Sequence, residues 1–230
     1  MVKKSAWGSY GVRLLWYDGC MAQASRIFLN GSLYHIYNRG VEKRTVFLDD
    51  ADFRHFLLTL SFYQQLNSAG KLSKSGYALV DRAPELKFNV VAYCLMPNHF
   101  HLILKQLAEG GVRRGLSDIL NSYTRYFNMK YGRVGPLFQG TFKSVCILTD
   151  EQFVHVLRYV LLNPFAGGLV KDFGQYRWSS FREYLDNSGL ICNFDEINSR
   201  FSTKESFKTF VGNYADYARQ LDLIKHDVLE

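Results

Sequence analysis

Apolar residues recur along the chain with two different spacings, one typical of strands and the other of helices. Alternation of apolar and polar positions, which turns every second side chain to one face of a strand, predicts strands within residues 26–40, 86–95, 99–105 and 135–148. Apolar residues three and four apart, which form a stripe along a helix, predict helices at residues 49–63, 117–130 and 151–163. Pro164 is expected to end the last helix.

The order of these elements, strand–helix–strand–strand–helix–strand, fits an α+β domain of ferredoxin-like type. Such a domain has an antiparallel sheet with helices packed on one face. We expect three segments: a poorly organised N-terminus at 1–25, the domain at 26–170, and a helical C-terminal extension at 171–230. The helices of the extension are predicted within 178–185 and 205–221. Inside the domain, the stretch 68–84 contains Gly, Ser and Lys and predicts a long loop.

Two histidines stand two residues apart at the start of the third predicted strand. His99 and His101 alternate with apolar neighbours, so both imidazoles leave the same face. Pro97 and Asn98 are turn residues, and the apolar run 90–95 before them predicts the partner strand of a hairpin. Two imidazoles side by side suit chelation of one metal ion. The same pattern also fits two partly buried histidines that are hydrogen-bonded to backbone.

The helix predicted at 151–163 carries a second group of candidate residues. Tyr159 and Asn163 are four residues apart and therefore project from the same side of the helix, with His155 one turn earlier. A carboxamide oxygen is a hard ligand compatible with Mg²⁺ or Mn²⁺, and a phenol can act as a covalent nucleophile. Taken alone, the pair fits a core tyrosine and an asparagine at the end of a helix better than it fits a catalytic site.

The charge balance points toward a polyanionic partner. The chain carries 28 Lys+Arg against 21 Asp+Glu, a net charge of +7, together with 15 Tyr and 18 Phe. Basic and aromatic residues interleave in the segment 113–143, where basic groups could follow a nucleic-acid backbone while rings stack on bases. The candidate DNA-binding residues are Arg39, Arg113, Arg114, Arg125, Tyr126, Lys130, Tyr131, Arg133 and Lys143.

The cysteines and the absence of long apolar runs favour a location in the cytoplasm. The four cysteines, Cys20, Cys94, Cys146 and Cys192, show no CxxC spacing, which favours isolated, reduced thiols. No apolar run approaches the length of a transmembrane helix, and the N-terminus lacks the core of a signal peptide. We therefore expect a cytoplasmic protein with no membrane partner.

An ordered series of motifs links these candidates to a known family. The motifs are YHIYNRG (34–40), VVAYCLMPNHFHLIL (90–104), SYTRYFNMKYGRVGPLFQGTFKS (122–144), YVLLNPFAGGLV (159–170) and YRWSSFREYL (176–185). Together they resemble the tyrosine-dependent HUH transposases of bacterial insertion sequences, most of all the branch of REP-associated tyrosine transposases.

The resemblance implies a role for each residue that matches. His99 and His101 correspond to the paired metal ligands, Asn163 to the third ligand, and Tyr159 to the nucleophile. The implied activity is cleavage and rejoining of DNA through a 5′-phosphotyrosine, with Mg²⁺ or Mn²⁺ as cofactor. The implied partner is single-stranded DNA that forms a hairpin, and the implied assembly is a monomer or homodimer.

Two other functions remain open at this stage. A DNA-binding protein of the same fold that performs no strand transfer, for example one domesticated for a host role, would carry the same residues. An unrelated zinc or iron hydrolase could also use a His-x-His pair. The second alternative lacks a nearby carboxylate to act as ligand or general base, which counts against it.

Overall fold

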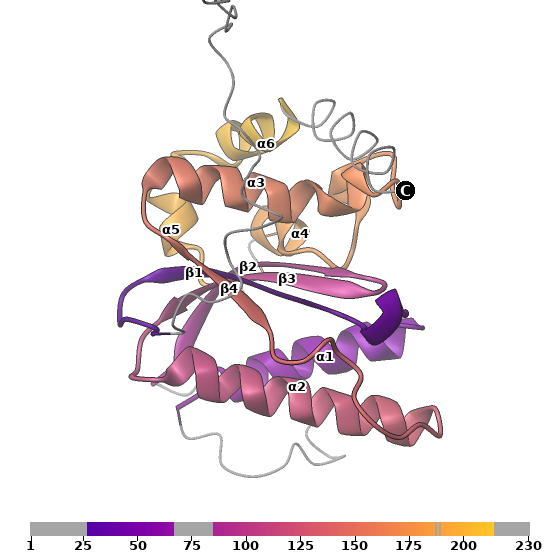
Figure 1. The fold of residues 1–230 in the computed structure, drawn as a ribbon. Coiled ribbons are helices and arrows are strands. Elements are labelled where there is room, and N and C mark those ends of the chain that lie inside the picture. Colours follow the sequence, from indigo (N-terminus) through magenta and orange to yellow (C-terminus); the bar gives the residue numbers. More distant parts are fainter. Residues whose placement is uncertain (1–26, 67–84, 187, 189, 214–230) are drawn as a thin grey trace, which may run out of the picture.

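A four-stranded antiparallel sheet with the order β2-β3-β1-β4 forms the centre of the computed structural model, which describes residues 27–66, 85–186, 188 and 190–213 (Figure 1). The strands are β1 (Leu33–Arg39), β2 (Phe88–Met96), β3 (His99–Gln106) and β4 (Lys143–Ile147). The helices are α1 (Asp50–Tyr63), α2 (Gly111–Lys130), α3 (Asp150–Ala166), α4 (Ser180–Leu185), α5 (Asp195–Asn198) and α6 (Lys204–Gly212), with 3₁₀ turns η1 (Val41–Lys43) and η2 (Phe173–Gln175).

The expected ferredoxin-like order of strands and helices is confirmed, but helices cover both faces of the sheet. Figure 1 shows α1 and α2 on one face, whereas α3 and the shorter helices α4, α5 and α6 lie on the other. The side chains of Phe100, Leu102 and Leu104 on β3 point toward α1 and α2, where Phe100 packs 5.2 Å from Phe56, measured between ring centroids. His99 and His101 alternate with these residues, so they face α3.

The start of α2 differs from the expectation. The helix begins at Gly111, not near Ser117, and its first turns lie directly against the start of β2. A Cβ atom at Gly111 would stand 2.4 Å from the carbonyl oxygen of Lys87, and one at Gly115 would stand 2.4 Å from the Phe88 ring. Gly111 and Gly115 are therefore required by the close packing of the helix on the strand.

The end of α3 also differs from the expectation, because the helix continues through Pro164 to Ala166. Proline has no N–H to donate, but its ring does not prevent the following residues from keeping helical geometry. The amide of Gly167 donates to the Asn163 carbonyl at 2.9 Å and closes the last turn. Asn163 thus lies inside a helix, one turn after Tyr159.

Several expectations fall outside the described residues. The predicted N-terminal segment 1–25, the predicted loop 68–84 and the last part of the helix predicted at 205–221 belong to this group. Of that last helix, the described part is α6. Among the described residues, Cys94, Cys146 and Cys192 form no disulfide with one another. Within the same part of the chain, no helix combines the length and apolarity needed to cross a bilayer.

The described part of the C-terminal extension covers the outer edge of β2. The Leu95 amide donates to the Trp178 carbonyl at 2.9 Å, and the Asn193 amide donates to the Val90 carbonyl at 2.8 Å. The hydroxyl of Ser180 bonds both the amide and the carbonyl of Tyr93. Backbone groups that an edge strand would otherwise leave open are thereby paired.

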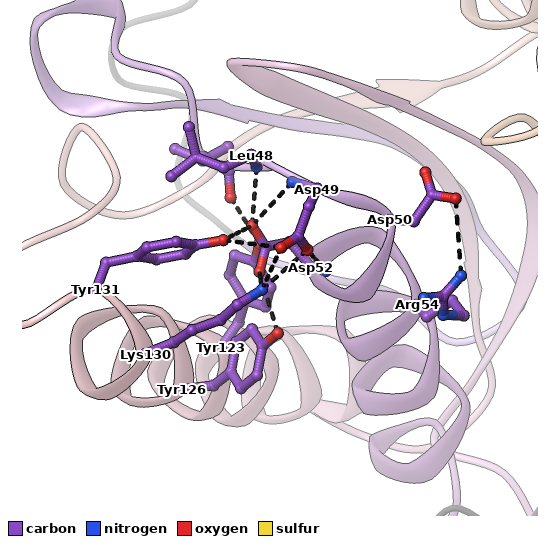
Figure 2. Close-up of polar contacts among 10 residues, drawn as sticks. Leu48, Asp49, Asp50, Asp52, Arg54, Tyr123, Tyr126, Lys130 and Tyr131 are labelled. Carbon is purple, nitrogen blue, oxygen red and sulfur yellow. Dashed lines mark hydrogen bonds and ion pairs between the residues drawn. The ribbon is translucent and has the colours of Figure 1, made fainter.

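A buried carboxylate ties the start of α1 to the end of α2. Asp52, fully buried, accepts hydrogen bonds from the Lys130 ammonium at 2.7 Å and from the hydroxyls of Tyr131 at 2.8 Å and Tyr126 at 3.0 Å. Figure 2 shows these three side chains pointing from α2 toward Asp52. Burial disfavours the Lys130 charge, but the hydrogen bonds to Asp49 and Asp52 outweigh it and raise the pKa of Lys130.

Replacing Lys130 by Met should lower the free energy of unfolding by about 2 kcal/mol, because the buried Asp52 carboxylate loses its cation. The measurement is urea unfolding of both proteins at neutral pH. Lys208→Met, an identical change at an exposed position on α6, is the matched control and should stay within about 0.5 kcal/mol of the native protein. Equal unfolding midpoints for Lys130→Met and the native protein would contradict a stabilising role for the ion pair.

Candidate active site

The four residues that the sequence singled out for chemistry meet between the sheet and α3. The rings of His99 and His101 lie 5.0 Å apart on the face of β3 that is turned toward α3. The Tyr159 ring lies edge-on to His101 at 5.2 Å between centroids. One turn further along α3, the Asn163 side-chain oxygen stands 3.3 Å from Nε2 of His99. The expected convergence of two strand residues and two helix residues is therefore present.

The contacts of His99 place two lone pairs opposite each other. Its Nδ1 stands 2.6 Å from the side-chain oxygen of Asn98, and its Nε2 stands 3.3 Å from the side-chain oxygen of Asn163. A neutral imidazole carries only one N–H, so one of the two nitrogens keeps its lone pair and faces an amide oxygen. Burial above all, then the positive charge of Arg39, lowers the pKa of His99 to about 4, while the contact with Asn163 acts in the opposite direction. Two acceptors in contact beside a neutral ring form a place where a cation is stabilised.

A third histidine, which the sequence analysis did not select, belongs to the same cluster. His35 on β1 is 2% exposed, and its Nε2 lies 3.0 Å from Nδ1 of His101. Burial lowers the pKa of His35 to about 4, so this ring is neutral at neutral pH. The signal in the sequence is the alternation of His35 and Tyr37 along the first strand, which repeats the spacing of the histidine pair on β3.

Tyr37 is the second residue of this cluster that the sequence analysis did not select. Its ring stacks on His35 at 5.2 Å and lies 5.9 Å from His101, both measured between centroids. The side chain is half-buried, and burial raises its pKa. His101 is therefore flanked by two phenols, Tyr37 on the sheet and Tyr159 on α3.

The donor atoms fit a hard divalent cation if the carboxamide takes part. Among the described residues there is no group of three or more His, Cys, Asp or Glu side chains that could hold a metal ion. A metal bound by His99 and His101 would have the side-chain oxygen of Asn163 beside it, since that oxygen stands 3.3 Å from Nε2 of His99. Two neutral imidazoles and a carboxamide oxygen are compatible with Mn²⁺ or Mg²⁺ and leave coordination positions for other oxygen ligands.

Two of the candidate DNA-binding residues lie on the same side of the sheet as the histidines. Arg39 pairs with His99 across β1 and β3, and Lys143 pairs with Tyr37 across β4 and β1. Residues paired in this way project from the same face of the sheet. The Lys143 ammonium stands 5.9 Å from the centroid of the Tyr37 ring. Positive charge therefore borders the histidine cluster.

The other seven candidates lie on α2 or directly after it, so the structure does not bring them together with the histidines. They are Arg113, Arg114, Arg125, Tyr126, Lys130, Tyr131 and Arg133. Their helix packs on the opposite face of the sheet, as Figure 1 shows. Several also have partners within the protein: Arg114 bonds the Glu109 carbonyl, and Arg133 bonds Asn128 at 3.0 Å. Their contact with DNA stays a prediction.

His155, one turn before Tyr159, is exposed and does not pack in the core. Its Nε2 stands 3.9 Å from the carboxylate of Glu151, one turn earlier on the same helix. It is therefore a surface residue of α3.

Comparisons with known proteins show a shared fold. No family model matches the chain, and no curated protein matches it either. Among solved structures, the chain is similar to a REP-associated tyrosine transposase bound to a REP hairpin, with a TM-score of 0.51 and 18% identity over 76% of this chain and 90% of the other. A bacterial tRNA(His) guanylyltransferase-like protein in complex with ATP matches with a TM-score of 0.36 and 8% identity, over 64% of this chain and 65% of the other. In the first match, the α+β fold is shared over most of the length of both chains.

Proposed function

We propose that this protein is a metal-dependent tyrosine transposase of the HUH type, which cleaves and rejoins single-stranded DNA through a covalent protein–DNA link. The observation that carries the proposal is the convergence of α3 on the histidine pair. Tyr159 lies against His101, and Asn163 lies against His99, so a nucleophile and a third metal ligand share one helix face. The fold shared with a REP-associated tyrosine transposase supports the same conclusion.

The proposed reaction starts at the Tyr159 hydroxyl. Its oxygen attacks the phosphorus of a phosphodiester, the new tyrosine–phosphate bond forms, and the bond to the 3′ oxygen breaks. One strand end then leaves with a 3′-OH, while the other remains attached to the protein through its 5′ phosphate. Since the link retains the phosphodiester, a 3′-OH from another strand can reverse the step and join the two ends without ATP.

His99, His101 and Asn163 would hold Mg²⁺ or Mn²⁺ in this proposal. When bound, the ion would polarise the scissile phosphate as a Lewis acid and offset negative charge in the transition state. The residues themselves contribute neutral donor atoms, so they would leave the charge of the ion uncompensated and would place no carboxylate against the anionic phosphate. Arg39 beside His99 adds a positive charge at the same edge.

The proposed substrate is single-stranded DNA with a hairpin. The similar transposase was solved with a REP hairpin, and the basic residues Arg39 and Lys143 border the candidate site of this chain. The half-buried Tyr37 has its ring 5.9 Å from the Lys143 ammonium and could offer that ring to a base. Rings and cations in this combination favour a flexible single strand, whose bases are accessible for stacking.

Tyr159→Phe should abolish the covalent adduct, with a loss of at least about 1,000-fold, because the ring's packing survives while the nucleophilic oxygen is removed. The measurement is a denaturing gel of protein incubated with end-labelled hairpin DNA, in which a protease-sensitive shifted band marks the adduct. Tyr37→Phe is the matched control, since it removes the other phenol beside His101 and should retain the adduct. Tyr126→Phe, on the opposite face of the sheet, should retain it as well. If the adduct persists in Tyr159→Phe and disappears in Tyr37→Phe, the nucleophile is Tyr37 on β1 and not Tyr159.

The second prediction concerns the metal. His99→Ala and Asn163→Ala should each weaken Mn²⁺ binding by at least about 10-fold, because each removes one donor atom from a site with three protein ligands. Calorimetric titration of metal-free protein measures this directly. His155→Ala removes an exposed imidazole from the same helix and should leave the affinity unchanged. Unchanged Mn²⁺ affinity in His99→Ala would refute the ligand assignment.

The third prediction concerns the form of the DNA. The native protein should cleave a single-stranded oligonucleotide that folds into a hairpin and leave a fully paired duplex of the same sequence intact. In a continuous duplex the phosphodiester is held in a stiff double helix, which cannot bend into a site between a sheet and a helix at low cost. The products are resolved on a sequencing gel with Mg²⁺ present. Equal cleavage of both forms would argue against a single-strand substrate.

A further inference from the structure

Each histidine of the proposed metal site has its second ring nitrogen, Nδ1, against a partner side chain. Nδ1 of His99 contacts the Asn98 side chain, and Nδ1 of His101 contacts His35. The two partners come from different elements, the β2–β3 turn and β1. The same arrangement at both ligands suggests one purpose, because the group at Nδ1 decides which nitrogen of a neutral imidazole carries the proton.

The Asn98 side chain has only one orientation that satisfies its contacts. Its Nδ2 donates to the Lys43 carbonyl at 3.1 Å, which leaves Oδ1 as the atom directed at His99. An amide oxygen can only accept, and the Asn98 oxygen stands 2.6 Å from Nδ1 whereas the Asn163 oxygen stands 3.3 Å from Nε2, so the shorter contact favours the proton of His99 on Nδ1. The Nε2 lone pair is then free to face Asn163, which is the geometry that a metal ligand requires.

The carbonyl that orients Asn98 belongs to a segment held against the hairpin turn. The Val46 and Phe47 amides both donate to the Pro97 carbonyl, at 2.8 and 3.0 Å, and the Gly40 amide donates to the Asn98 carbonyl at 2.8 Å. Lys43 has a left-handed backbone conformation, with φ of 58°. Such a conformation is uncommon for a residue other than glycine and persists because the surrounding bonds define it.

At His101 the partner is itself a histidine, so the shared proton has two possible positions. If His101 donates from Nδ1 to Nε2 of His35, its own Nε2 carries a lone pair. If His35 donates instead, the neutral His101 ring carries its proton on Nε2 and cannot bind a metal through that atom. His35 is buried and its ring contacts those of both Tyr37 and His101, so this acceptor is held firmly in place.

We propose that Asn98 and His35 are the positioning residues of the site: they hold His99 and His101 in the Nδ1–H tautomer, with both Nε2 atoms prepared for one divalent cation. Neither residue is a ligand in this arrangement. Each acts through the histidine that it contacts, as outer hydrogen-bond partners do at metal sites in general. The inference rests on the metal site of the proposed function but not on DNA cleavage.

The first experiment reads the tautomers without any metal. Protein with ¹⁵N-labelled histidine is freed of metal with a chelator, and long-range ¹H–¹⁵N correlation spectra identify the protonated nitrogen of each ring. The expected result is the Nδ1–H tautomer for both His99 and His101, assigned with the His99→Ala and His101→Ala variants. An Nε2–H tautomer at either position would overturn the assignment for that residue.

The second experiment separates the hydrogen bonds from packing. Asn98→Ala and His35→Phe should each weaken Mn²⁺ affinity by about 10- to 100-fold, because each removes the acceptor while Phe keeps the stacked ring. Asn98→Asp and His35→Gln return an acceptor oxygen near the lost atom and should recover most of the affinity. His55→Phe, the same change on α1 at the opposite face of the sheet, is the matched control and should have no effect.

The two experiments also separate this inference from the proposed function. Native protein that binds Mn²⁺ and shows both Nδ1–H tautomers, yet cuts no hairpin DNA, would leave the positioning roles intact and refute the nuclease proposal. Native protein that cuts DNA while Asn98→Ala and His35→Phe bind Mn²⁺ as tightly as the native chain would refute the positioning roles alone. No measurable Mn²⁺ binding to the native protein would refute both the metal site and the positioning roles.

Discussion

The pairing register of β3 is the constraint on which the candidate site depends. Side chains of a strand alternate between faces, so a shift of β3 by one residue would turn both His99 and His101 away from α3 and into the apolar layer beneath the sheet. The two-residue turn at Pro97 and Asn98 sets the register on one side, with Met96 paired to His99. The pairing of Tyr37 with His101 sets it on the other side. Everything that faces α3 follows from these two alignments.

The parts of the site that could be predicted from the sequence are those that repeat within one element. His99 and His101 share a strand, and Tyr159 and Asn163 share a helix, so spacing alone places each pair on one face. His35 could not be found in this way, because its contact with His101 joins residues 66 positions apart and depends on which strands pair. The start of α2 was mispredicted for a related reason: Gly111 and Gly115 are required by the strand that packs against them, which the spacing within the helix does not show.

The basic and aromatic residues of α2 illustrate a different limit of sequence patterns. Lysine and tyrosine interleaved along a helix are typical of a nucleic-acid surface, but the same residues also suit a buried acid on a neighbouring helix. Here Tyr126, Lys130 and Tyr131 all bond Asp52 of α1, on the face of the sheet opposite to the histidines. A DNA strand that contacts both α2 and the histidine cluster would have to pass around an edge of the sheet.

The segment that follows α3 pairs with β2 along the outer edge of the sheet, through residues 178–180 and 192–193. A shortened chain ending near residue 170 would still encode all four strands and the histidine cluster, but it would leave the amides and carbonyls of β2 open. Exposed strand edges recruit other chains, so such a fragment would accumulate as insoluble aggregate during expression. The predicted end of the domain at residue 170 is therefore unsuitable for producing the sheet and the histidine cluster in isolation.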